Sequence, residues 1–332
     1  MAVEFDSFSP RLRLPLIAAP MLRISGIDLT AEACINGVIG SFPTVNARGP
    51  GELDSWLTQI ADRCARAERP SAPVCPNILM RSDPEQLEAD IDVLLRHRVE
   101  MVLASVGSPE KYVRKLHDVG CFVWTDVASM RHVERALESG VDGLVLLSAG
   151  AGGQTGWING LSFARAVREF YDGPLVLAGG ISDGHALLAA RVLGCHLGLM
   201  GTRFIATDEA TAVAGYKQML IDSTIDDVLL TKAISGIDAN FLRPSIINCG
   251  LDPEQVAMPL SKERARELFS DFAGRMRGPK RWVDLWSAGH TVSAVDRTRP
   301  VADLIDEIER EYVEAQEATR ALIDADVPRV AG

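Results

Sequence analysis

The stretch GVDGLVLLSAGAGGQTGWING, residues 140–160, joins an apolar run to a glycine-rich turn and to the start of a helical segment. Its first half is nearly continuous in Val and Leu, which is typical of a strand buried on both faces of a parallel sheet. Its second half exposes much bare backbone, so N–H groups can approach a flat or anionic ligand closely. Gln154 places one side-chain amide in this loop. A tight turn that merely contains glycine is the alternative interpretation.

This strand and turn form one of eight similar units. The other apolar runs begin at residues 14, 37, 72, 99, 120, 173 and 197. Helical periodicity separates them, as in residues 108–120, where Val113, Leu116 and Val119 share one face. Eight alternating units predict a (β/α)8 TIM barrel. A doubly wound open sheet is the alternative, but no G-x-G-x-x-G follows the first strand.

The rhythm of the sequence changes after the eighth run. Residues 206–281 contain helical and loop patterns and no strand of comparable strength. We therefore predict a barrel domain over residues 1–212, a helical lid over 213–281, and a C-terminal segment, 282–332, that packs back on the barrel. The last part, from Pro300, has the spacing of a long amphipathic helix.

Composition restricts the class of function. The 332 residues are 47% hydrophobic and 24% charged, and the formal net charge of −11 argues against nucleic acid or an anionic membrane as partner. The start of the chain does not resemble a signal peptide, and no run has membrane-spanning length. Six scattered cysteines, with no metal-ligand spacing, fit a reducing cytoplasm and favour buried, unreactive thiols over metal sites. A homodimer is compatible with the sequence.

The site of a TIM barrel lies at the C-terminal ends of its strands. The residues that the pattern places there are Pro20, Met21, Asn46, Asn77, Ser105, Thr125, Asp126, the loop 149–156, Gly179, Gly180, Gly201 and Thr202. Two of these segments, AGGISDG at 178–184 and MGTRF at 200–204, carry glycines where a phosphate could meet backbone N–H groups. A phosphate site after strands seven and eight is frequent in this architecture. Simple turn glycines are the alternative.

Four segments, IAAPM, PTVNAR, LAGGISDG and MGTRF, are closely similar to segments of one enzyme family. The sequence resembles the nitronate monooxygenase family over about residues 12–210, and more weakly to LWSAGHTVSAV at 285–295. Relatives of that family include flavin-dependent enoyl reductases and NADH:quinone reductases. The resemblance implies bound FMN, with its phosphate on Gly179, Gly180, Gly201 and Thr202. The remaining cofactor contacts that it implies are Pro20, Met21, Asn77, Asp126, Ala149, Gly150, Gly152 and Gly153.

The sequence departs from the family at one position. The relatives read AGGH in this loop, with a histidine that acts as base or proton donor, whereas Gln154 stands here. An amide does not take up a proton near neutral pH, so base catalysis from this position is lost. Among the six histidines, His290 is the candidate to replace it, because it follows the predicted lid and could approach the flavin from above. The other five are expected in packing, surface or loop roles.

The leading functional hypothesis is a flavin-dependent oxidoreductase that oxidises an alkyl nitronate with O2 to a carbonyl compound and nitrite. The alternative is an NAD(P)H-dependent flavin reductase of an enoyl thioester or quinone. A non-redox phosphate-binding lyase or isomerase is a third class, but it needs a base at a strand end, and Asp126 is the one candidate. The basic stretch 275–281 is interpreted as a solvated helix end rather than as a docking site for an acidic partner.

Overall fold

The predicted TIM barrel is confirmed. The computed structural model describes residues 4–258, 268–269, 278–280 and 282–326. Eight parallel strands close in the order β1-β2-β3-β4-β5-β6-β8-β9. Their bounds are Leu16–Ala18, Ile39–Pro43, Val74–Leu79, Met101–Ser105, Phe122–Val127, Gly143–Leu147, Leu175–Ala178 and Leu197–Met200. Every strand is bonded to two neighbours, so the barrel has no open edge.

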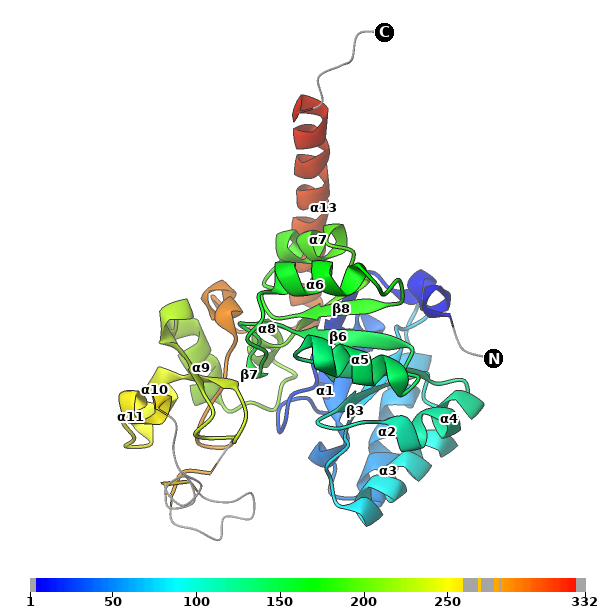
Figure 1. The fold of residues 1–332 in the computed structure, drawn as a ribbon, viewed down its shortest axis with the longest axis horizontal. Helices are drawn as coiled ribbons and strands as arrows, with labels where there is room; N and C mark the ends of the chain where they lie inside the picture. Colours follow the sequence, from blue (N-terminus) through cyan, green and yellow to red (C-terminus); the bar gives the residue numbers. More distant parts are fainter. Residues whose placement is uncertain (1–3, 259–267, 270–277, 281, 327–332) are drawn as a thin grey trace.

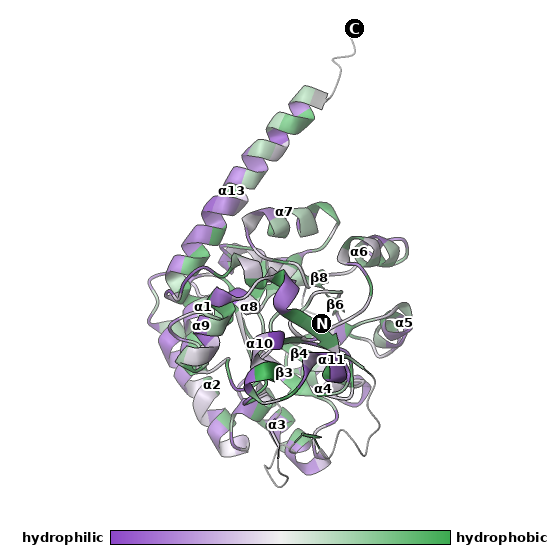
Figure 2. Ribbon diagram, turned by 90° about the vertical axis from the view of Figure 1, so that its left-hand side faces the viewer, coloured by the Kyte–Doolittle hydropathy of each residue, from purple (hydrophilic) through white to green (hydrophobic). Residues whose placement is uncertain are grey.

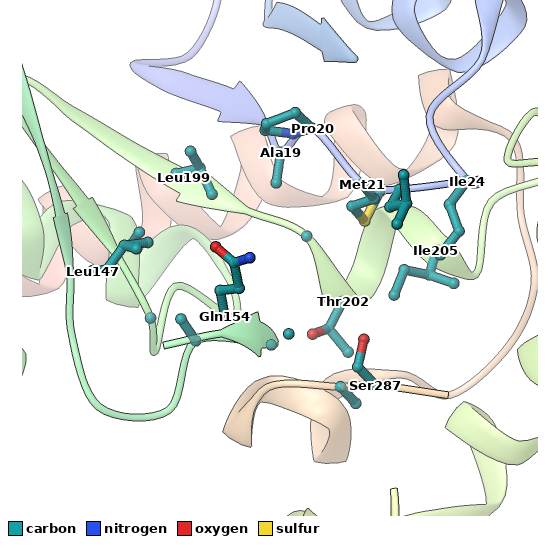
Figure 3. A pocket seen from close by; sticks show the side chains of 18 of the residues that line it. Ala19, Pro20, Met21, Ile24, Leu147, Gln154, Leu199, Thr202, Ile205 and Ser287 are labelled. Carbon is teal, nitrogen blue, oxygen red and sulfur yellow. The ribbon is translucent and has the colours of Figure 1, made fainter. Parts of the chain in front are cut away.

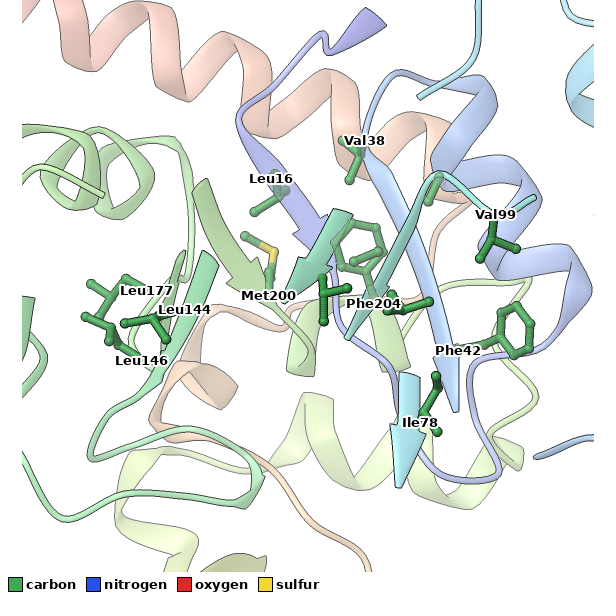
Figure 4. Close-up of a cluster of buried hydrophobic side chains, with 14 of the residues drawn as sticks. Leu16, Val38, Phe42, Ile78, Val99, Leu144, Leu146, Leu177, Met200 and Phe204 are labelled. Carbon is green, nitrogen blue, oxygen red and sulfur yellow. The ribbon is translucent and has the colours of Figure 1, made fainter. Parts of the chain in front are cut away.

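Alternate residues of the strands supply two separate hydrophobic layers. In β6, Leu144 and Leu146 belong to the layer between the strands and the helices (Figure 4). Val145, between them in sequence, belongs instead to the second cluster, which contains Phe5, Phe122 and Trp124. The first residues of the chain close the bottom of the barrel, where a short 3₁₀ helix, Phe5–Arg11, places Phe5 edge-on against Trp124 at a ring distance of 5.6 Å. The interior of the lower half of the barrel is therefore filled by side chains, and the barrel opens toward a ligand at the opposite end, where the strands end.

Helices cover the outside of the barrel. They are α1 to α7, with bounds Ile27–Ile35, Pro50–Ala65, Pro84–Arg96, Glu110–Asp118, Met130–Glu138, Gly160–Arg168 and Gly184–Val192. Local side chains define several starts: the carboxylates of Asp83 and Asp183, for example, accept hydrogen bonds from first-turn N–H groups. The helix expected within 108–120 is confirmed, and its Val113 and Leu116 are buried.

The segment after β9 differs from the expected helices and loops. It contains the helices α8 to α11 (Thr202–Ile205, Ala214–Asp222, Arg243–Asn248 and Pro253–Ala257), the short 3₁₀ helix Ile225–Asp227, and two strands, β10 (Val228–Thr231) and β11 (Ala239–Leu242). Strand β10 pairs antiparallel with β11, and β11 in turn pairs antiparallel with β7 (Gly153–Gln154), which belongs to the glycine-rich barrel loop. Four-residue strands give almost no sequence signal, and β7 finds its partner far along the chain, where Gln154 is paired with Ala239.

The expectation of a purely helical lid was therefore wrong, although its boundaries stay a prediction. These elements lie beside the barrel mouth (Figure 1). Most of the helix expected near 261–276, and most of the basic stretch 275–281, lie outside the described residues.

The last helix is long, as predicted. After a 3₁₀ helix at His290–Ala294, α13 spans Val301–Asp326 and buries Leu304, Ile305 and Ile308 against α7 and α1. Its second half extends beyond the body of the protein (Figures 1 and 2). Within the described residues, no helix is both long enough and apolar enough to cross a membrane.

Candidate active site

A cavity of about 290 Å³ opens at the C-terminal ends of the barrel strands. Figure 3 looks into it. All eight barrel strands, or the residues directly after them, contribute to its wall. The opposite wall comes from the segments that follow the barrel, namely Tyr216, Trp282, Leu285, Trp286, Ser287, Ala288 and Thr291. The cavity therefore lies between the barrel mouth and a wall made by Tyr216 of the predicted lid and by residues 282–291 of the predicted C-terminal segment.

Twelve of the fourteen predicted site residues line this cavity. They are Pro20, Met21, Asn77, Asp126, Gly150, Gly152, Gly153, Gln154, Gly179, Gly180, Gly201 and Thr202. Ala149 is exposed and is not part of the wall. The His290 side chain is also exposed, because its backbone N–H binds Gly150 O at 2.9 Å and its ring packs against the outer side of Gly150. The structure thus brings the glycine loops and Gln154 together and leaves His290 outside the wall.

Gln154 lies on β7 with its side chain directed into the cavity (Figure 3). Its backbone is aligned with Ala239 of β11, and Asn240 is aligned with Gly153. The buried Asn240 amide also donates a hydrogen bond to Ala151 O at 2.7 Å. Within the described part of the chain, no residue binds the Gln154 amide, so it is free to contact a ligand. Its position depends on a strand of the neighbouring sheet, which sequence reasoning missed.

The glycines of the 150–153 loop are needed partly for packing. A Cβ on Gly152 would lie 2.7 Å from Gly289 N, and one on Gly289 would lie 2.6 Å from Gly150 O. Two chain segments far apart in sequence therefore approach each other through bare backbone. The sequence indicated close approach at this loop, but the structure shows that segment 288–290 makes much of that approach.

The two predicted phosphate loops meet at one side of the cavity. Gly179 and Gly180 have φ values of +109° and +81°, and no atom lies within 4 Å of the position that a Gly180 Cβ would take. Gly201 and Thr202 follow β9, and the buried Thr202 hydroxyl accepts a hydrogen bond from Gly289 N at 3.0 Å. Because Gly180 has a left-handed backbone and faces open space, the loop forms a cradle that a larger side chain would fill. Such a cradle suits an anion that is bound by backbone N–H groups.

Polar groups of β3, β4 and β5 form a chain on another side of the cavity. The buried Asn77 amide donates to Leu103 O at 2.9 Å and to Ser105 Oγ at 2.8 Å. Burial raises the pKa of Asp126 to about 6, against the opposing effect of hydrogen bonds from Ser105 and the Val106 N–H. Val106 has φ +58°, a strained conformation for a β-branched residue. The N–H of the strained Val106 therefore donates a hydrogen bond to the Asp126 carboxyl group, whose pKa is about 6.

The wall contributed by the later segments is apolar and aromatic. Tyr216 and Trp286 are stacked with ring centroids 5.0 Å apart and planes inclined by 9°. The Tyr216 hydroxyl donates to Ser287 O, and Trp286 Nε1 donates to Val283 O at 2.8 Å, so both polar ends are satisfied within the protein. Among the described lining residues, Asp126 has the one ionisable carboxyl or basic side chain. The cavity therefore suits a small or flat ligand that has few charges.

The remaining predicted residues have structural roles. Asn46 does not line the cavity; it accepts a hydrogen bond from Arg23 N and donates to Met21 O and Ser25 O, so it fixes the first loop. His97 and His117 bind Asp54 and Asp142 at 3.0 and 2.9 Å, as expected for packing histidines. No group of three or more metal-binding side chains occurs in residues 4–326 where the structure describes them.

A TIM barrel with a largely apolar cavity and glycine loops at its strand ends has the architecture typical of an enzyme active site. The family model described as nitronate monooxygenase matches residues 57–311. The chain therefore belongs to the nitronate monooxygenase family and is a flavin-dependent oxidoreductase, which confirms the family expected from the motifs.

Similarities to individual proteins agree. The chain is 25% identical to a nitronate monooxygenase of Paraburkholderia phytofirmans, over 92% of this chain and 94% of that one. It is 26% identical to a hydroxy-methyl-oxo-octahydro-indene-carboxyl-CoA dehydrogenase of Rhodococcus jostii, over 70% and 64% of the two chains. The structures of FabK from Thermotoga maritima and of nitroalkane oxidase from Streptomyces ansochromogenes share the fold. The FabK structure has a TM-score of 0.80 and 24% identity, with 96% of this chain and 97% of that chain covered. The nitroalkane oxidase structure has a TM-score of 0.75 and 22% identity, with 94% of this chain and 99% of that chain covered.

Proposed function

We propose that the protein binds FMN and oxidises an alkyl nitronate with O2, releasing a carbonyl compound and nitrite. The observation that carries this proposal is the single cavity in which a backbone cradle, at Gly179–180 and Gly201–Thr202, faces the same space as the Gln154 amide. FMN, the flavin typical of this family, supplies the electron transfer from substrate to O2 when bound. The residues below supply its binding and the orientation of the substrate.

The two glycine loops hold the phosphate through N–H groups. On the other side of the cavity, Asn77 Nδ2 is used within the protein, which directs its amide oxygen Oδ1 toward a ligand donor such as a flavin N–H. Pro20 and Met21 provide an apolar surface for the ring. In this arrangement the cofactor is bound without a basic side chain among the described lining residues.

Gln154 orients the substrate. Its amide can donate a hydrogen bond to a nitro oxygen, but it cannot remove the α-proton of a neutral nitroalkane. A preformed nitronate has already lost that proton, so orientation is sufficient. Tyr216, Leu285 and Trp286 exclude water from this side of the cavity, which strengthens the amide's hydrogen bond to the anion.

The test is an anaerobic experiment with the purified holoprotein. The flavin absorbance is followed after addition of a nitronate, the neutral nitroalkane, NADH or NADPH, and nitrite and the carbonyl product are measured after O2 is admitted. Bleaching by the nitronate, with nitrite formed on oxidation, supports the proposal. Bleaching by NADH or NADPH alone would instead support the second candidate, a flavin reductase of an enoyl thioester or quinone. The apolar cavity and the relative named for a carboxyl-CoA favour that candidate.

A protein that contains no flavin would support neither candidate and would favour the non-redox phosphate-binding barrel.

All six cysteines are free, which supports the reducing cytoplasm expected from the sequence as the place of action.

A further inference from the structure

A second cavity, of about 410 Å³, lies at the closed end of the barrel, away from the site described above. It is bordered by the last turn of α2 and by the residues that lead into β3 and β4. Its polar lining includes Cys64, Arg11, Ser71 and His97. Cys64 is half-buried, so a small reagent can reach its sulfur from this cavity.

A second thiol lies directly behind Cys64. Cys34, in the last turn of α1, is fully buried, and helices α1 and α2 pack side by side. The two cysteines are bonded to neighbouring residues of one segment: Ala72 N donates to Cys34 O at 2.9 Å, and Ser71 Oγ donates to Cys64 O at 3.2 Å. Cys34 Sγ lies 3.4 Å from Pro73 O and packs against Gly40 of β2, so it is held in a fixed position.

The surroundings separate the chemical roles of the two thiols. The hydrogen bond from Cys34 lowers the pKa of Cys64 to about 7, helped by Ser71 and the positive charge of Arg11 and opposed by burial. The same pair interaction, together with burial, raises the pKa of Cys34. Cys64 is therefore the thiol that ionises near neutral pH, and thiolate is the reactive form.

The other cysteines lack this combination. Burial raises the pKa of Cys75, Cys121 and Cys195, and these buried residues line neither of the two cavities described. Cys249 is half-buried like Cys64, but burial raises its pKa as well. The expectation that most of the cysteines are buried and unreactive stays a prediction for these four, and the Cys34–Cys64 pair is where we depart from it.

We propose that Cys64 and Cys34 form a peroxide-oxidised dithiol site that is separate from the flavin cavity. The Cys64 thiolate attacks one oxygen of hydrogen peroxide, the O–O bond breaks, and Cys64 sulfenic acid and hydroxide form; the hydroxide takes the proton that the Cys64 thiol released on ionising and becomes water. The Cys34 sulfur then attacks the Cys64 sulfur, the S–O bond breaks, and a second water leaves. In total, two thiols lose two electrons and two protons, and one peroxide becomes two waters. The resulting disulfide joins α1 to α2.

The experiment uses the full-length, reduced protein without substrate. It is treated with hydrogen peroxide at neutral pH, and the remaining thiols are alkylated in denaturant and mapped by peptide mass spectrometry. We expect loss of two of the six thiols and one linked peptide pair, Cys34 with Cys64, lighter by two hydrogen atoms. Cys34→Ser should stop at a Cys64 sulfenic acid that dimedone traps, and Cys64→Ser should abolish oxidation at both positions.

Cys249→Ser is the matched control, since it removes the other half-buried thiol and should leave the cross-link unchanged. Oxidation at Cys249 before Cys64, or Cys64 oxidised in the unchanged protein without linkage to Cys34, would overturn the proposal. Rapid alkylation by a limiting amount of iodoacetamide provides a second readout in the unmutated chain. Cys64 should be labelled first, and preferential labelling of any other cysteine would contradict its assigned reactivity.

Discussion

Gln154 and Asp126 are the two residues whose side-chain chemistry distinguishes this cavity. The first is an amide that cannot act as a base, and the second is a carboxyl group whose pKa burial raises to about 6. Both lie in a wall that is otherwise mostly apolar or bare backbone. Changing Gln154 should therefore alter the preference between substrates, and changing Asp126 should alter the pH dependence of stability.

If Gln154 only orients the substrate, the unchanged enzyme should act far better on a preformed nitronate than on the neutral nitroalkane. Replacing Gln154 with His should raise turnover of the neutral substrate, by about 100-fold or more, because only that substrate needs a base. Turnover of the nitronate should change little. The measurement is the ratio of kcat/KM for the two forms. Gln154→Asn controls for loss of the original side chain, and equal activity of the unchanged enzyme on both forms would contradict the role.

Asp126 should make stability depend on pH. Its folded pKa, about 6, is above the ordinary value of 3.8, so the fold favours the protonated form. Its stabilising contribution is full below pH 3.8 and is lost as pH rises through 6. Asp126→Asn should therefore gain stability relative to the unchanged protein, by about 2 kcal/mol, between about pH 4 and pH 7.5. Urea unfolding of both proteins at the two pH values measures this difference, and parallel pH profiles would show that Asp126 is not perturbed.

The loops and short strands around the cavity act through backbone rather than side chains. Gly180 has φ +81° and open space at its Cβ position, and Gly236 has φ +84° and equally open space far along the chain. Gly180→Val should yield colourless protein because the side chain fills the proposed phosphate cradle. Gly236→Val adds a similar backbone strain and should keep its flavin. FMN released on denaturation is measured for both variants. Stoichiometric FMN in Gly180→Val would contradict the placement of the phosphate at this loop.

The β7–β11 pairing makes Asn240 a positioning residue for Gln154. Asn240→Ala removes the bond to Ala151 O and should lower kcat on the nitronate by about 10-fold, with a smaller change in KM, because the strand that carries Gln154 loosens. In a Gln154→Ala background the same change should have little further effect. Equal losses in both backgrounds, determined by a double-mutant cycle on kcat, would show that Asn240 acts by another route.

The C-terminal helix connects the outer shell of the protein to the loops of the site. Glu307 of α13 forms ion pairs with Arg203, which follows Thr202, and with Arg299, and both guanidinium groups are buried. Glu307→Ala leaves two buried positive charges without this carboxylate. We expect a loss of about 3 kcal/mol in the free energy of unfolding.

Glu314→Ala, on the exposed side of the same helix, is the matched control and should change stability by less than about 0.5 kcal/mol. Denaturant unfolding of the three proteins compares them directly. Similar stabilities for both variants would mean that the ion pairs around Glu307 contribute little.

The barrel and most of its site could be predicted from the sequence because they depend on local patterns. Eight apolar runs give eight strands, and in a closed parallel barrel the strand ends must meet at one face, so Asn77, Asp126 and Gly180 are brought together by topology alone. The long final helix follows from its periodicity.

Contacts between distant segments were decided only by the tertiary structure. The β7–β11 pairing, the stacked Tyr216 and Trp286, and the packing of segment 288–290 on Gly152 join parts of the chain far apart in sequence. Short strands and single aromatic residues carry no periodic signal that could reveal such partners. The same limit explains His290, whose backbone N–H is bonded to Gly150 O while its side chain is exposed, and Cys64, whose pKa is lowered by Cys34 of a neighbouring helix. Local backbone preference and hydrophobic period are encoded residue by residue, whereas long-range packing depends on how the finished surfaces fit together.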